Sequence, residues 1–125
     1  MNKKWEQFIF SIIAHLTLPL LPLIVEKLLT GSVANETWAI TAAMYTIAIG
    51  VSSNWLPILG VSLLVSMISV CSFGFLKAGT TANFDVPTSS LIAIIAFFIV
   101  HTIERYMRHV NDGEIFLGVG VEKDV

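Results

Sequence analysis

Charged residues are scarce in this chain, and their scarcity is the first constraint on what the protein is. Only 13% of the 125 residues are charged, against roughly 25% in an ordinary soluble domain, whereas 55% are hydrophobic. A soluble fold of this length has too little interior to hide so much apolar surface. The composition therefore predicts a single domain for which lipid is the solvent.

Several other features are missing as well, and each absence excludes a class of function. The net charge is −2, so no basic stripe can neutralise phosphates, and we predict no direct nucleic-acid binding. The single cysteine, Cys71, lies in an apolar run, which excludes a disulfide framework or a zinc site within one chain. Because we find no catalytic triad order, facing carboxylate pair or phosphate-binding glycine loop, we predict neither enzymatic activity nor a cofactor.

Long apolar runs are what the chain has instead. They predict four transmembrane helices, at about 7–29, 36–53, 55–77 and 88–108. The first segment contains Pro19 and Pro22, which bend a helix, and the second barely reaches the roughly 20 residues that a span needs. We therefore expect an all-α membrane protein with short loops. Its two parts are a four-helix transmembrane domain and a short cytoplasmic tail, at residues 1–109 and 110–125.

The distribution of basic residues predicts the orientation. Four spans put both termini on one side of the membrane, and most Lys and Arg residues fall on that side. They are Lys3, Lys4, Arg105, Arg108 and Lys123. Only Lys27 and Lys77 fall on the other side, so the positive-inside rule predicts cytoplasmic termini in a bacterial inner membrane. The apolar run 8–25 exceeds the roughly 7–15 residues of a signal-peptide core, so we read the first segment as a retained anchor.

Small residues recur at helical spacing in the second and third segments. Residues four positions apart form a column on one face of each helix, and one further serine continues the polar edge of the second column. These residues are Ala42, Thr46 and Gly50 in the second segment, and Ser62, Ser66 and Ser69 in the third. Such columns let two helices approach closely, and their hydroxyl groups bond to carbonyls of the same or a neighbouring helix. They predict packing within the bundle, a subunit interface of a homo-oligomer, with a tetramer favoured, or a serine-lined pore.

Two histidines lie inside apolar runs at similar depths on the cytoplasmic side. They are His15 in the first segment and His101 in the fourth. An ionisable residue within the membrane is a functional hypothesis, and histidine changes charge near neutral pH. The pattern predicts either a switch or neutral histidines that are hydrogen-bonded to a serine or a carbonyl.

Polar residues gather where the fourth segment leaves the membrane. Beyond His101, they are Glu104, Arg105, Arg108 and His109. Glu104 and Arg108 are four residues apart, so they share a helix face. This collar predicts an anchor that contacts membrane-lipid phosphates, or a docking surface for a cytoplasmic protein partner.

An apolar piece in the tail is the last unusual feature. Ile115, Phe116 and Leu117 follow the turn Asn111-Asp112-Gly113 and are interrupted by glycine shortly afterwards. The pattern is compatible with a strand that adds to the sheet edge of a partner, or with a chain end that lies free or against the inner leaflet. The partner-binding prediction therefore comprises the collar and these three residues.

From MNKKWEQFIF to ERYMRHV, the layout of two charged-flanked helical hairpins and a short tail resembles the KwaA family. Members of that family are the membrane subunits of the two-component Kiwa anti-phage defence system. The resemblance implies an oligomeric membrane sensor that recruits a cytoplasmic, DNA-binding effector, and it transfers no residue role.

We thus predict an oligomeric inner-membrane sensor or scaffold that recruits or regulates a cytoplasmic partner, with anti-phage defence as the setting that the resemblance implies. The alternative is a pore-forming or holin-like small channel, which the serine run and the bent first segment favour. A dimeric transporter is a third possibility, which the scarcity of buried charge for ion coupling disfavours.

Overall fold

The structure is a computed structural model that describes residues 2–113, and over these residues it is all-helical. In chain order the elements are α1 (Lys3–Ile12), the π-helical η1 (Ile13–Thr17), the 3-10 helix η2 (Leu18–Leu20), α2 (Leu21–Thr30), α3 (Asn35–Ser52), α4 (Leu56–Lys77), α5 (Val86–Tyr106) and the π-helical η3 (Met107–Asn111). The prediction of an all-α fold is confirmed for this part of the chain. The apolar tail residues Ile115, Phe116 and Leu117 lie outside it.

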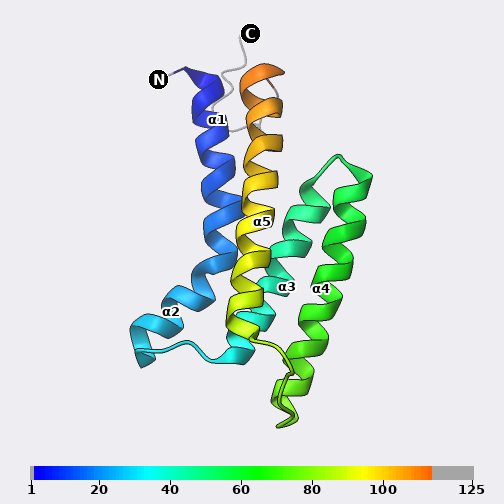
Figure 1. Ribbon diagram of the computed structural model, residues 1–125. Coiled ribbons are helices and arrows are strands. Elements are labelled where there is room, and N and C mark those ends of the chain that lie inside the picture. Colours follow the sequence, from blue (N-terminus) through cyan, green and yellow to red (C-terminus); the bar gives the residue numbers. More distant parts are fainter. Residues whose placement is uncertain (1, 114–125) are drawn as a thin grey trace.

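The first long helix bends in the middle. Pro19 has no N–H group to bond to the carbonyl of His15, and Pro22 has none for Leu18. The chain continues through one π-helical and one 3-10 segment before α2 begins. The helix α2 ends at Thr30, and Gly31 follows it in the left-handed region (φ 78°). In Figure 1, α2 diverges from the bundle after this bend. The sequence predicted the bend, and the missing donors explain where it occurs.

The helices α3 and α4 form a close antiparallel hairpin. A Cβ atom added at Gly50 would overlap the Ser62 hydroxyl and lie only 2.5 Å from Ser62 Cβ, so the two backbones approach as only glycine allows. Further along the hairpin, the hydroxyl of Ser66 donates a 3.0 Å hydrogen bond to the carbonyl of Ala43. Close backbone packing and one hydrogen bond between helices therefore hold this pair.

The centre of the molecule is α3. It packs against both α4 and α5, whereas α4 and α5 touch each other little (Figure 1). The buried apolar core lies where α3 meets η1 and α5, and it contains Leu16, Tyr45, Ile49, Ile94 and Phe97. As a result α3 is largely covered by protein, and a groove remains between α4 and α5.

Three helical runs are long and apolar enough to cross a membrane. They span Lys3–Thr30, Leu56–Lys77 and Val86–Asn111, with 28, 22 and 26 residues. The segment α3 has 18 residues and is not among them, because Asn35 and Glu36 in its first turn lower its mean hydropathy, with a smaller contribution from residues such as Thr41 and Tyr45. Asn35 is exposed, whereas Thr41 and Tyr45 are fully buried within the protein. Three of the four predicted spans thus have the length and composition of a span, and that α3 crosses the membrane stays a prediction.

The outer surface of the bundle is strongly apolar. Leu28 and Leu29 on α2 are 79% and 80% exposed, and Leu64 on α4 is 64% exposed. In water such a surface would be an aggregation liability, whereas in a bilayer it faces a solvent of matching polarity. The distribution of apolar side chains therefore agrees with a helical membrane protein.

Candidate functional site

Most of the collar is buried at the end of the bundle where α1 begins and η3 ends, here called the terminal end. Glu104 is 3% exposed and Arg105 is 4% exposed, and His101 and His109 are buried beside them. One carboxylate oxygen of Glu104, Oε1, accepts a 2.9 Å hydrogen bond from the backbone N–H of Asn54. Glu104 thus binds the turn between α3 and α4, fifty residues away in the sequence.

Two arginines of α5 and η3 meet the C-terminal end of α3. The guanidinium groups of Arg105 and Arg108 donate hydrogen bonds of 3.2 Å and 3.3 Å to the carbonyl of Ser52. Ser52 is the last residue of α3, so its carbonyl has no partner within that helix and lies at the negative end of the helix dipole. Cationic donors are favourable at this position, and the two arginines therefore stabilise the terminus of α3.

The two intramembrane histidines face each other. The ring centroids of His15 and His101 are 5.4 Å apart, and Nδ1 of His15 lies 3.3 Å from the carbonyl oxygen of Ser11. Arg105 Nε donates to His101 Nε2 at 3.3 Å, so that nitrogen carries a lone pair and the His101 ring proton lies on Nδ1. This Nδ1 is buried and has no hydrogen-bond partner among the described residues. Within residues 2–113 no group of three His, Cys, Asp or Glu side chains could hold a metal ion.

These contacts make the cluster an internal connection. It joins η1 through His15, the end of α3 through Ser52, the α3–α4 turn through Asn54, and α5 through its own side chains. The prediction that the collar binds a partner stays a prediction. At this end the exposed neighbours that a partner would meet first include Lys3, Lys4 and Met107. No residue pattern pointed to Ser52 or Asn54 as members of the site, because both contribute backbone groups.

Three aromatic rings pack beside this cluster. Trp5 and Phe8 of α1 contact Tyr106 of α5 in edge-to-face arrangements, with both centroid distances 6.0 Å. Such pairs add about 0.5–1.5 kcal/mol beyond the area that they bury. Aromatic rings at this level of a membrane helix match the interfacial belt of membrane proteins.

The small-residue columns lie inside the chain's own helix packing. Ala42, Thr46, Gly50, Ser62 and Ser66 are buried. The hydroxyl of Thr46 donates to the Ala43 carbonyl at 3.2 Å, and that of Ser62 donates to the Leu59 carbonyl at 2.8 Å. Their hydroxyl groups are thus occupied within the helix hairpin. Ser69 differs, because it lines a cavity that opens between α4 and α5.

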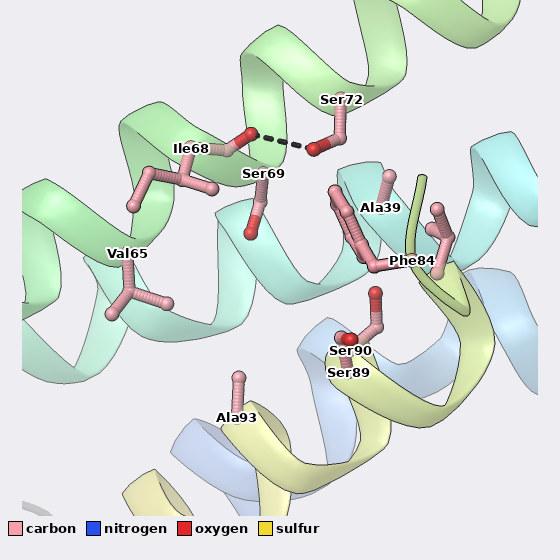
Figure 2. Close-up of a pocket in the computed structure, with 10 residues that line it drawn as sticks. Ala39, Val65, Ile68, Ser69, Ser72, Phe84, Ser89, Ser90 and Ala93 are labelled. Carbon is pink, nitrogen blue, oxygen red and sulfur yellow. Dashed lines mark hydrogen bonds between the residues drawn. The ribbon is translucent and has the colours of Figure 1, made fainter. Parts of the chain in front are cut away.

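This cavity contains residues that the sequence did not single out. Ser89 and Ser90 lie in the first turns of α5, opposite Ser69 and Ser72 of α4, and Phe84 closes one side (Figure 2). The sequence Thr88-Ser89-Ser90 looked like a helix start, for which hydroxyl residues are common. Only the packing of α5 against α3 shows that two of these serines face a cavity.

Comparison with protein-family models, with curated proteins and with solved structures finds no match. The resemblance to the KwaA family therefore stays a prediction from layout.

Proposed function

We propose that the chain is a subunit of an oligomeric membrane scaffold or sensor that recruits or regulates a cytoplasmic protein, with antiviral defence as the candidate setting. The observation that carries the proposal is the buried cluster at the terminal end. Through Glu104, Arg105 and Arg108 it connects α5 and η3 to the end of α3 and to the α3–α4 turn, at the level where these helices leave the apolar region. A displacement of any of these helices within the bilayer would change the same surface, which is what a membrane sensor needs.

The proposal includes the topology of the chain. In it α3 is a fourth span that protein shields from lipid, and both termini face the cytoplasm of a bacterial cell. Two facts support this: α3 runs antiparallel to α4 in a close hairpin, and α4 is itself long enough to cross. At 1.5 Å per residue, the 18 residues of α3 extend about 27 Å, close to the roughly 30 Å of a hydrocarbon core.

The experiment is a mild-detergent pull-down from the native host, followed by mass measurement of the intact complex. We expect a homo-oligomer of the chain, with a tetramer favoured, together with a cytoplasmic protein. A variant truncated after His109 should keep the oligomer and lose that protein. Substitution of Ile115, Phe116 and Leu117 by serine should do the same, whereas Lys123→Gln serves as a control in the same segment. A truncated chain that still recruits the protein would remove the tail from the mechanism.

A pore is the second candidate, and the cavity that Ser69 lines favours it. Ser62 and Ser66, on which the sequence-based pore hypothesis also rested, are buried against α3 and do not line this cavity. Reconstitution of the purified chain in liposomes separates the two candidates. Leakage of ions or dye that Ser69→Leu abolishes would favour the pore, and tight liposomes at every applied potential would exclude it.

A further inference from the structure

The groove between α4 and α5 contains two cavities in series along the helix axes. The first, of about 310 Å³, is nearer the α3–α4 turn and is lined only by apolar residues. Its lining is Pro57, Ile58, Val61, Ala96, Phe97 and Val100. The second, of about 120 Å³, follows one turn further along both helices and contains the four serines (Figure 2). Together the cavities extend from Pro57 to Ser72, about 22 Å of helix.

The second cavity has a polar wall whose hydrogen bonds are incomplete. Ser72 donates its hydroxyl to the Ile68 carbonyl at 2.8 Å and is thereby satisfied. The side chain of Ser90 is only 7% exposed and lines the cavity, and within residues 2–113 its hydroxyl has no hydrogen bond. In Figure 2 the side chain of Ser69 on α4 lies across the space from those of Ser89 and Ser90 on α5. A hydroxyl in a low-dielectric site without a partner is unfavourable, so this wall favours a guest with an acceptor oxygen.

The residues that line the two cavities indicate what kind of ligand would fit them. No charged side chain lines either cavity, so the group that meets the serines is neutral. The adjoining cavity offers only hydrocarbon contacts, so the rest of the guest is apolar. The guest is therefore a molecule with a neutral oxygen-bearing end and a long apolar part.

The depth of the serines identifies where such a molecule comes from. Ser69 and Ser72 precede Lys77, the end of α4, by eight and five residues, and Ser90 lies four residues after Val86, the start of α5. The hydroxyls thus lie about 6–12 Å inside the ends of these helices. Because α4 extends about 33 Å and a hydrocarbon core is roughly 30 Å thick, the serines lie in the outer part of that core, next to the ester groups of one leaflet.

We propose that the α4–α5 groove binds one acyl chain of a glycerolipid. Ser69 and Ser90 donate hydrogen bonds to an ester carbonyl, and the chain runs along the groove into the apolar cavity between Val61 and Ala96. The site stands independently of the scaffold function, since it rests on groove residues that the terminal-end cluster does not include.

Photolabelling in proteoliposomes tests the proposal. The probe is a glycerophospholipid that carries a diazirine midway along its acyl chain, and labelled residues are mapped by mass spectrometry. We expect labelling of Ile58, Val61 and Ala96 to exceed that of Leu63 and Leu64, which are exposed on α4 outside the groove. Equal labelling of both sets would mean ordinary surrounding lipid and would overturn the proposal. Cross-links between two copies through the groove would assign it to a second subunit instead.

Substitutions test the two halves of the site separately. Ser90→Ala should lower groove labelling by about fivefold, the effect of one lost hydrogen bond, whereas Ser72→Ala should leave it unchanged because that hydroxyl is bonded to its own helix. An ether-linked probe, which lacks the ester carbonyl, should label the wild type more weakly than the ester probe labels Ser90→Ala, because it loses the hydrogen bonds of both Ser69 and Ser90. Ala96→Phe should block the apolar cavity, with the exposed Ile95→Phe as its control. Thermal unfolding confirms that each variant is folded, and undiminished labelling in folded Ser90→Ala would contradict the role of that serine.

Discussion

At the scale of single residues, the carboxylate of Glu104 has the most demanding position. It lies buried at a level where the chain leaves the apolar region, and one of its oxygens accepts the backbone N–H of Asn54. Its other oxygen, Oε2, is buried with no hydrogen-bond partner among the described residues. Removal of the carboxylate takes away a charged acceptor from the part-buried hydrogen bond that holds the α3–α4 turn, and hydrogen bonds to charged groups contribute more than neutral ones.

Glu104→Ala should therefore lower the stability of the detergent-solubilised protein by about 1–3 kcal/mol. Glu104→Gln keeps a carbonyl oxygen for Asn54 and should lose less. The measurement is thermal unfolding followed by tryptophan fluorescence, with the exposed Glu6→Ala as the control. If Glu104→Ala and Glu6→Ala melt at the same temperature, the carboxylate does not hold the α3–α4 turn.

Gly50 is the second residue whose identity the packing dictates. In Gly50→Ala the new methyl group overlaps Ser62, so the hairpin must separate, and we expect a loss of about 1–3 kcal/mol. Gly60→Ala in α4 meets no atom within 4 Å and should be neutral or gain up to about 1 kcal/mol from helix propensity. Both variants are compared by the same thermal unfolding. Equal melting temperatures would show that α3 and α4 are not in close contact at this point.

At the scale of helices, α3 decides the architecture. It is the only described helix of more than ten residues that lacks the apolar composition of a span, and it is the one with the most protein around it. These two properties belong together, because polar residues such as Thr41 and Thr46 are tolerated where they face other helices instead of lipid. The groove between α4 and α5 follows from the same arrangement, since both helices pack on α3 and not on each other.

Deletion of the hydrogen bond between Ser66 and Ala43 tests how much this bond contributes to the contact between α3 and α4. Ser66→Ala should lower stability by about 0.6–1.5 kcal/mol, the range for such bonds between membrane helices. Ser72→Ala removes the same hydroxyl group from a position where it bonds only within α4, so its loss should be smaller. The paired comparison cancels the change in residue type. A larger loss in Ser72→Ala than in Ser66→Ala would contradict the assignment of Ser66 to the helix contact.

At the scale of the whole molecule, hydrogen bonds between polar groups connect the helices at the terminal end, whereas further along the bundle α4 and α5 make few contacts with each other. The terminal end holds the cluster around Glu104 and the aromatic rings around Trp5. Beyond it, α2 diverges after the bend near Pro19, and α4 and α5 leave a groove (Figure 1). The polar contacts between helices are thus concentrated at the terminal end, whereas the proposed lipid site lies in the groove.

The sequence predicted the helices well, because apolar runs, prolines and the glycine at position 31 act locally. It placed His15 and His101 at similar depths but did not show that they meet, since two depths do not reveal which helices are neighbours. It could not show that Glu104 and Arg105 bond to the backbone of a turn fifty residues away, because backbone groups leave no trace in the residue pattern. The serine-lined cavity opposite Ser69 became apparent only from the packing, because the sequence does not show that α4 and α5 lie on either side of a groove.

The proposed four-span topology requires that α3 crosses the membrane and returns the chain to the side of the N-terminus. Single cysteines in a Cys71→Ala background test it through labelling with a membrane-impermeant maleimide in intact and lysed cells. The exposed positions are Asn2, Ser32, Asn54, Thr81 and Asp112. We predict that cysteines at 2, 54 and 112 react only after lysis, whereas those at 32 and 81 react in intact cells. Labelling of positions 32 and 54 from the same side, with 2 and 112 on opposite sides, would show that α3 does not cross and would contradict the account.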